Sequence, residues 1–177
     1  EAVADPRYAF SAANQFLVAA GKQPLFQIHL VGNEHEVSLH DGVFSVHADK
    51  LWKDVTKTDL IIIPALFGDM KSAIDKNRNF IPWIKKQHEQ GAEVASLCVG
   101  AFLLASTGLL SGKSCSTHWA FYNEFRTMFP DVTVKDGCII TEENRIYSSE
   151  GANSYWNLLV HLVEKNTERD TAKLAAK

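Results

Sequence analysis

Apolar residues occur along this chain in two arrangements. Short continuous apolar runs at residues 60–64 and 93–97 are typical of strands buried on both faces of a parallel sheet. Between them, apolar residues recur three or four positions apart, which predicts helices with one buried face. Strands alternating with helices in this way predict an α/β fold with a largely parallel sheet.

Asp5 is predicted to be the N-cap of the first helix, with Pro6 at the first helical position. Its buried face would carry Phe10, Ala13 and Leu17. Further helices are predicted over residues 81–90, over residues 119–129, and from Asn153 or Ser154 onward. The last of these carries an apolar stripe of Trp156, Leu159, Val160 and Val163 at helical spacing.

Other segments are predicted as strands. Residues 26–31 form one, and residues 37–40 and 43–47 flank Asp41-Gly42, a strong hairpin signal. Short strands are also expected at 132–134, 138–141 and 145–148. Because the chain opens on a helix, we expect the sheet to need an extra central strand from residues before Glu1.

A sharp strand-to-helix corner is predicted at Cys98. The apolar run 93–97 ends there, Val99 and Gly100 follow, and a helix-like stretch covers residues 101–110. Backbone N–H groups at a helix start favour an anion, so we expect this thiol to ionise below the ~8.5 of a free cysteine. A second short strand, 114–117, delivers His118. This is the layout of a nucleophile elbow with a histidine nearby, although cysteine and histidine are also common as plain core residues.

Composition narrows the function classes. The chain has 177 residues, 46% hydrophobic and 22% charged, as expected for one globular domain. A net charge of −3 gives no basic surface for nucleic acid. Three widely spaced cysteines favour a reducing compartment. No apolar run reaches the ~20 residues of a membrane span, so we expect a cytoplasmic protein with no membrane partner.

Two short motifs resemble metal-binding or phosphate-binding sequences, but neither has the spacing that such binding requires. Cys115 and His118 lie three apart on a strand, on opposite faces, and no second ligand pair accompanies them. Residues 108–114 mimic a phosphate loop but are one residue short and run from helix to strand. We therefore expect no metal and no cofactor.

The stretch SLCVGAFLLASTGLLSGKSCSTHW resembles the ThiJ/PfpI family, part of the class I glutamine amidotransferase-like superfamily. It is most similar to the sensor domain of AraC-type transcriptional regulators. The similarity is carried by the Cys98 corner, by residues 108–113 and by residues 117–119, and it extends more loosely over most of the chain.

The resemblance implies a flavodoxin-like, doubly wound fold with helices on both faces and a nucleophile-elbow cysteine. It implies a family domain over residues 1–166 and, over residues 167–177, the start of a linker to a helix-turn-helix domain. The function implied is effector sensing in a transcription regulator. Its partners would be a small-molecule effector, a second copy in a homodimer, and DNA, reached only through that C-terminal domain.

The ligand-binding residues implied are Cys98, Val99, Gly100 and His118, with Asp69 and Glu1 as further candidates. Asp69 lies on a loop after a buried strand, at the rim where open α/β sheets place their sites. Glu1 stands near the position of an acidic residue that the superfamily sets against the thiol. Many enzymes of the superfamily have threonine or histidine where this chain has Val99.

A cysteine-dependent amidase, hydratase or glyoxalase-like enzyme is the alternative. Cys98 would then be the nucleophile and His118 the acid and base. The tail after residue 163 and the unplaced orienting acid favour the sensor.

Overall fold

A four-stranded sheet forms the centre of the molecule, in a computed structural model that describes residues 2–39 and 42–177. Its strand order is β5 (Leu60–Ile63), β6 (Glu93–Ser96), β10 (Ile146–Ser149) and β9 (Ile140–Glu143). The first three strands are parallel, and β9 joins β10 as an antiparallel hairpin. The predicted α/β fold with a largely parallel sheet is confirmed.

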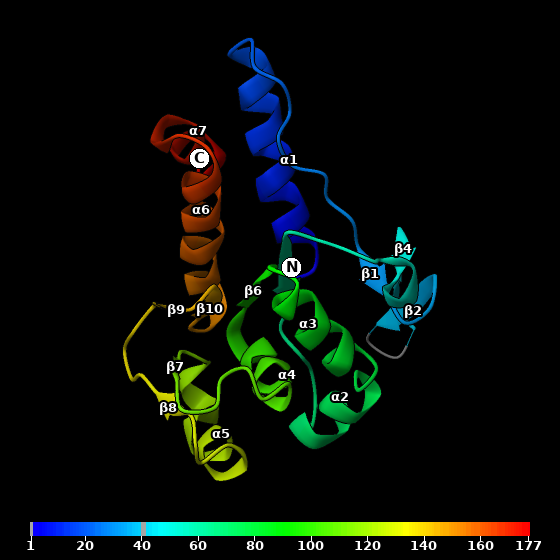
Figure 1. The fold of residues 1–177 in the computed structure, drawn as a ribbon, viewed down its shortest axis with the longest axis vertical. Helices are drawn as coiled ribbons and strands as arrows, with labels where there is room; N and C mark the ends of the chain where they lie inside the picture. Colours follow the sequence, from blue (N-terminus) through cyan, green and yellow to red (C-terminus); the bar gives the residue numbers. More distant parts are fainter. Residues whose placement is uncertain (1, 40–41) are drawn as a thin grey trace.

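Helices cover both faces of this sheet (Figure 1). One face carries α2 (Met70–Lys76), α3 (Phe80–Glu89), α4 (Ala101–Ser106) and α5 (Tyr122–Met128). The other carries α1 (Ala4–Ala19), α6 (Tyr155–Asn166) and α7 (Arg169–Ala175). A three-layer arrangement results, as expected for a sheet whose strands are apolar on both faces.

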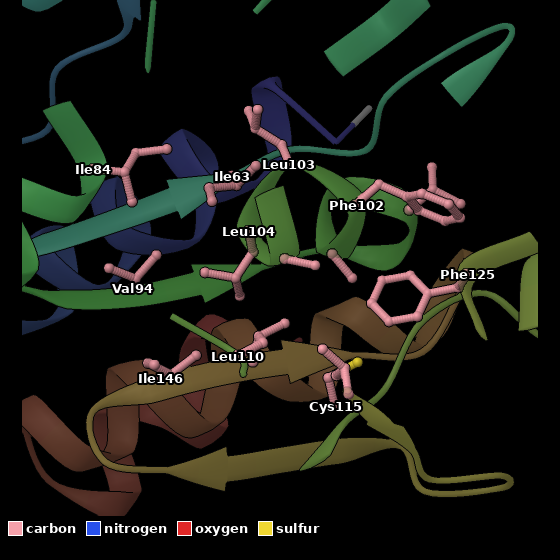
Figure 2. Packing of buried hydrophobic residues seen from close by; sticks show 14 of the residues in the cluster. Ile63, Ile84, Val94, Phe102, Leu103, Leu104, Leu110, Cys115, Phe125 and Ile146 are labelled. Carbon is pink, nitrogen blue, oxygen red and sulfur yellow. The ribbon is translucent and has the colours of Figure 1, made fainter. Parts of the chain in front are cut away.

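The larger of the two cores lies under α4. Figure 2 shows Ile63, Val94 and Ile146, one from each parallel strand, on the same side of the sheet as Leu104 and Phe102. Phe102 also meets the Phe125 ring edge-on, with 4.9 Å between the ring centroids. Every one of these side chains is buried, so α4 is held firmly on the sheet.

The second core holds the buried faces of the first and last helices. Phe10, Ala13 and Leu17 of α1 are buried, as predicted. In α6, Leu159 and Val163 of the predicted apolar stripe are buried, whereas Trp156 and Val160 are only half-buried. Helix α7 packs against both α1 and α6. Residues 169–175, most of the stretch 167–177, are therefore part of the packed structure.

Smaller strand pairs lie around the central sheet. Strands β1 (Val31–Gly32) and β4 (Lys50–Leu51) are parallel, and so are β7 (Ser114–Cys115) and β8 (Thr133–Val134). Strands β2 (Glu36–Leu39) and β3 (Phe44–His47) form the predicted antiparallel hairpin. Residues 40 and 41, which fall in the predicted strand 37–40 and the predicted Asp41-Gly42 turn, lie outside the described residues. Short 3₁₀ turns complete the chain: η1 (Trp52–Asp54), η2 (Cys98–Gly100), η3 (Trp119–Phe121) and η4 (Ala152–Ser154).

Three expectations about local structure were wrong. Residues 26–30 form no strand in the described structure: the Leu30 carbonyl accepts from the Asp49 and Lys50 amides, but regular strand pairing begins only at Val31, in β1. Asp5 does not cap α1, which starts one residue earlier, and its carboxylate instead accepts a hydrogen bond from the Tyr155 hydroxyl. The helix expected over residues 119–129 begins as the 3₁₀ turn η3 before α5.

Helix α2 was not predicted. Its capping residue is Asp69, whose carboxylate accepts a hydrogen bond from the Ser72 amide over 2.8 Å. None of the helices in the described part of the chain is long and apolar enough to cross a membrane.

Candidate functional site

The chain turns sharply at Cys98, between β6 and α4. Leu97 is still extended, and Cys98 then takes a positive φ of 56°, which a residue with a side chain rarely adopts. Such a conformation costs about 1–3 kcal/mol and persists only where the surrounding structure enforces it. The predicted corner is confirmed, and its thiol is half-buried at the carboxyl end of the sheet.

Gly100 explains how this corner fits against the neighbouring strand. A Cβ at position 100 would lie 2.6 Å from the carbonyl oxygen of Pro64 and 2.7 Å from that of Ile63. Both are backbone atoms and cannot swing aside, so only glycine fits there. Val99, between Cys98 and Gly100, is buried in the core and contributes packing.

His118 reaches the same edge from β7. The Thr117 hydroxyl donates a hydrogen bond to the Cys98 carbonyl over 3.2 Å, which ties the histidine segment to the corner. The imidazole Nδ1 of His118 accepts a hydrogen bond from the Ala120 amide over 3.2 Å and so caps the turn η3. The segment that carries His118 thus lies against the Cys98 corner.

The His118 ring is held tightly on two sides. A Cβ at Gly151 would lie 1.9 Å from its Cδ2 atom, so the ring rests directly on the Gly151 backbone. On another side it stacks on the Trp119 indole, with ring centroids 5.4 Å apart and planes at 28°. The Trp119 side chain itself is largely exposed.

Of the two acidic candidates, the structure describes only Asp69. Asp69 lies at the predicted loop after β5, but its carboxylate caps α2. It lines an open groove of about 430 Å³ together with Lys71, Asn123, Glu124, Thr127 and Met128. Neither Cys98 nor His118 lines that groove. Glu1 lies outside the described residues.

Some residues of this edge were missed at the level of sequence. Thr117 belongs to the stretch 117–119 that carries the resemblance to a family, but it was assigned no role, and neither was Gly151. The hydrogen bond between Asp5 and Tyr155 joins the start of α1 to the start of α6. It spans 150 positions of the sequence, so no local pattern could have indicated it.

The other two thiols have different surroundings. Burial raises the pKa of the Cys115 thiol to about 12, and its side chain lies in the core (Figure 2). The half-buried Cys138 thiol donates a hydrogen bond to the Ile140 carbonyl over 3.0 Å. Across residues 2–39 and 42–177, no three histidine, cysteine or acidic side chains converge as a metal site would require.

Known proteins are similar to this chain in sequence. The GbdR transcriptional regulator of Pseudomonas aeruginosa, of the helix-turn-helix type, is 27% identical over 112 residues, which are 63% of this chain and 29% of GbdR. The isonitrile hydratase of Pseudomonas putida is 24% identical over 151 residues, 85% of this chain and 64% of the enzyme. The chain thus spans less than two thirds of either relative.

A solved structure is similar to this chain in fold. An AraC family transcriptional regulator from Pseudomonas putida superposes with a TM-score of 0.78 at 17% identity, over 98% of this chain and 89% of that one. The sequence pattern of the DJ-1/PfpI family matches residues 3–165. The chain therefore belongs to the DJ-1/PfpI family.

Proposed function

We propose that this chain is the effector-sensing domain of an AraC-type transcription regulator and binds a small molecule beside Cys98 without turning it over. In the full-length regulator, DNA would be bound by a separate helix-turn-helix domain after this one, in the cytoplasm and as a homodimer. The net charge of −3 supports this division of labour, because DNA affinity rests mainly on phosphate-neutralising cations.

The hydrogen bond from the Ala120 amide to His118 Nδ1 carries the non-catalytic part of the proposal. A neutral imidazole has one N–H and one lone pair. Since Nδ1 uses its lone pair to accept from the amide, the ring proton belongs on Nε2. An Nε2–H group can donate a hydrogen bond to a ligand, but it cannot take a proton from the Cys98 thiol.

The helices that follow the site support a route for the signal. Gly151 touches the His118 ring and precedes the turn that opens α6. Helix α7 packs against α6, and a groove of about 300 Å³ at this junction is lined by Trp156, Asn157, Val160 and Ala176. A ligand that moves His118 would therefore act on α6 and, through it, on the tail.

The relatives support the same assignment. GbdR is a transcriptional regulator of which this chain matches 29%, as one domain of a longer protein would. The structural neighbour from Pseudomonas putida is itself an AraC family regulator.

A cysteine-dependent enzyme is the second candidate, favoured by two observations. Cys98 has the strained corner geometry that nucleophiles of elbow type adopt. The isonitrile hydratase relative matches more of this chain than GbdR does. In that function Cys98 would attack the substrate, and His118 would need to rotate or exchange its ring proton before it could act as a base.

A thermal-shift screen of small metabolites tests the binding proposal. The wild-type chain is compared with Cys98→Ala, with His118→Asn and with Cys138→Ala, the last being a half-buried thiol with its own partner in Ile140. Binding to the folded state stabilises a protein by an amount that grows with the logarithm of ligand concentration above its dissociation constant. We expect hits that raise Tm in wild type and Cys138→Ala and are weakened in the two site variants. Hits that are indifferent to both site substitutions would place the ligand elsewhere and contradict the proposal.

A further inference from the structure

The segment that carries His118 is tied to the end of β10 just before the histidine. The Ser116 backbone N–H donates a hydrogen bond to the Ser148 hydroxyl over 2.7 Å, and both residues are buried. A buried N–H that loses its partner costs free energy, so this bond is kept. A little further along both segments, the His118 ring rests on the Gly151 backbone. The bond at Ser148 therefore fixes where the histidine segment leaves β7.

A second tie between the same two segments lies just after the histidine. The Tyr122 hydroxyl, at the first residue of α5, donates a hydrogen bond to the Glu150 carboxylate over 2.8 Å. Both side chains are half-buried. Glu150 directly precedes Gly151, on which the His118 ring rests. The contact between ring and backbone thus lies between two hydrogen bonds, one on each side of His118 along the chain.

The Tyr122 side chain is held in the position that this bond requires. The Arg126 guanidinium, one turn further along α5, lies over its ring at 5.4 Å from the centroid, and Arg126 is paired with Asp136 over 2.5 Å. Burial, and after it the hydrogen bond to the Glu150 carboxylate, raises the pKa of Tyr122 above its usual value. The hydroxyl therefore keeps its proton at neutral pH and remains the donor.

Glu150 is fixed by its backbone as well. Its N–H donates to the Ile139 carbonyl over 2.9 Å, next to the last pair of the β9–β10 hairpin. With the backbone held in this way, the Tyr122 hydroxyl directs the carboxylate toward α5. Because Gly151 follows immediately, its backbone is held against the turn η3 that begins after His118.

The other contacts of the His118 ring restrain its orientation weakly. Gly151 supports the ring with a bare backbone. The ring stacks on Trp119 and meets the Phe121 ring edge-on, with centroids 5.9 Å apart, and such apolar contacts have little directionality. Its hydrogen bond from the Ala120 amide is 3.2 Å long, at the upper end of the usual range. The orientation of the imidazole therefore depends on how firmly the backbone beneath it is held.

We propose that Tyr122 and Glu150 are positioning residues for His118. Their hydrogen bond holds the Gly151 backbone beneath the imidazole, and the supported ring keeps its Nδ1 atom at the Ala120 amide. The ring proton then stays on Nε2. Both candidate functions use His118, so this positioning matters to a sensor and to an enzyme alike.

The position of the proton on the His118 ring tests the proposal. Nitrogen NMR of ring-labelled histidine, in weakly alkaline buffer, gives the ratio of the Nε2–H form to the Nδ1–H form, and His118→Asn identifies the signal. Tyr122→Phe removes the donor, Glu150→Ala removes the acceptor, and Glu150→Gln keeps an acceptor oxygen without the charge. Tyr147→Phe is the matched control, because it removes the hydroxyl of a buried tyrosine of β10 that accepts from Lys165 instead. Urea denaturation records the stability of each variant.

We expect the Nε2–H form to dominate in the wild type. The ratio should fall about fivefold in Tyr122→Phe and in Glu150→Ala, the effect expected for the loss of one hydrogen bond. Glu150→Gln and Tyr147→Phe should keep the wild-type ratio, even where Tyr147→Phe is as destabilising as Tyr122→Phe.

Three results would overturn the proposal. The first is a ratio that stays unchanged in Tyr122→Phe and Glu150→Ala. The second is an equal fall in Tyr147→Phe, because general loosening of β10 would then explain the change. The third is an equal fall in Glu150→Gln, because the charge and not the hydrogen bond would then act on the ring. None of these results depends on ligand binding, which the thermal-shift screen tests separately.

Discussion

His118 lies directly on the backbone of Gly151, so closely that a Cβ there would stand 1.9 Å from the ring. Gly151 has an ordinary extended conformation, with φ −82° and ψ 178°, that alanine adopts without strain. We therefore expect Gly151→Ala to destabilise the fold by about 1–3 kcal/mol purely through overpacking. Urea denaturation measures the change.

A double variant separates this contact from other causes. In Gly151→Ala combined with His118→Ala the ring is gone, so most of the loss caused by the alanine at 151 should be recovered. Neighbours in contact give such non-additive effects, whereas independent sites add. Strictly additive losses would show that the ring does not rest on Gly151.

Gly100 should tolerate alanine even less. The added Cβ would meet the carbonyl oxygens of Pro64 and Ile63, and neither can rotate away from it. Gly100 has helical torsions, with φ −58°, so alanine alone would otherwise gain about 1 kcal/mol of helix propensity. We expect a net loss of at least ~2 kcal/mol in urea denaturation. A neutral or stabilising Gly100→Ala would mean that the corner does not approach β5 this closely.

The three thiols should label in a fixed order. Burial raises the pKa of Cys115 to about 12, so at pH 8 only about one molecule in ten thousand carries its thiolate, the reactive form. Cys138 is half-buried and donates its proton to the Ile140 carbonyl. We expect brief iodoacetamide treatment and peptide mapping to find Cys98 modified first and Cys115 last. Faster labelling of Cys138 or Cys115 than of Cys98 would be inconsistent with the corner as the reactive position.

Asp49 should give stability a specific pH dependence. Hydrogen bonding from the Leu30 amide, and secondarily the Arg7 guanidinium, lowers the pKa of this carboxyl below its usual range. A lowered folded-state pKa adds stability above the unfolded value of about 3.9 and loses it as the pH falls through the folded value. We expect Asp49→Asn to cost about 1 kcal/mol at pH 7, and the difference from wild type to disappear in acid. Asp54→Asn, at an exposed position on η1, is the control. A cost that stays constant down to pH 2 would rule out the charge as its source.

Local sequence predicts those parts of the fold that are determined by residues close together in the chain. The Cys98 corner was predictable because an apolar strand, a small residue and a helix follow one another within ten positions. The hairpin of β2 and β3 was predictable from its turn and its alternation. Residues 26–30 were not, since they have a strand's alternation, yet no strand of the described structure pairs with them. The cap at Asp69 carried a usable signal for α2, an acidic residue just before a helix, which was overlooked.

Some features of the candidate site could likewise be predicted from the sequence, and others could not. Cys98 and His118 follow from motif spacing and from resemblance to a family. Which nitrogen of His118 carries the proton depends on the Ala120 amide. The position of its ring depends on Gly151, 33 positions away in the chain. Neither can be read from the residues alone, and both decide what the histidine can do.

A turnover assay tests the central claim most directly. Purified chain, Cys98→Ala and Cys138→Ala are each incubated with a small amide, an α-oxoaldehyde and a small isonitrile, and product is followed over many equivalents of protein. We predict no turnover above the buffer rate for any of them, because the lone pair of His118 Nδ1 is engaged by the Ala120 amide. Multiple turnover by wild type and Cys138→Ala that is abolished in Cys98→Ala would contradict the sensor and establish the enzyme.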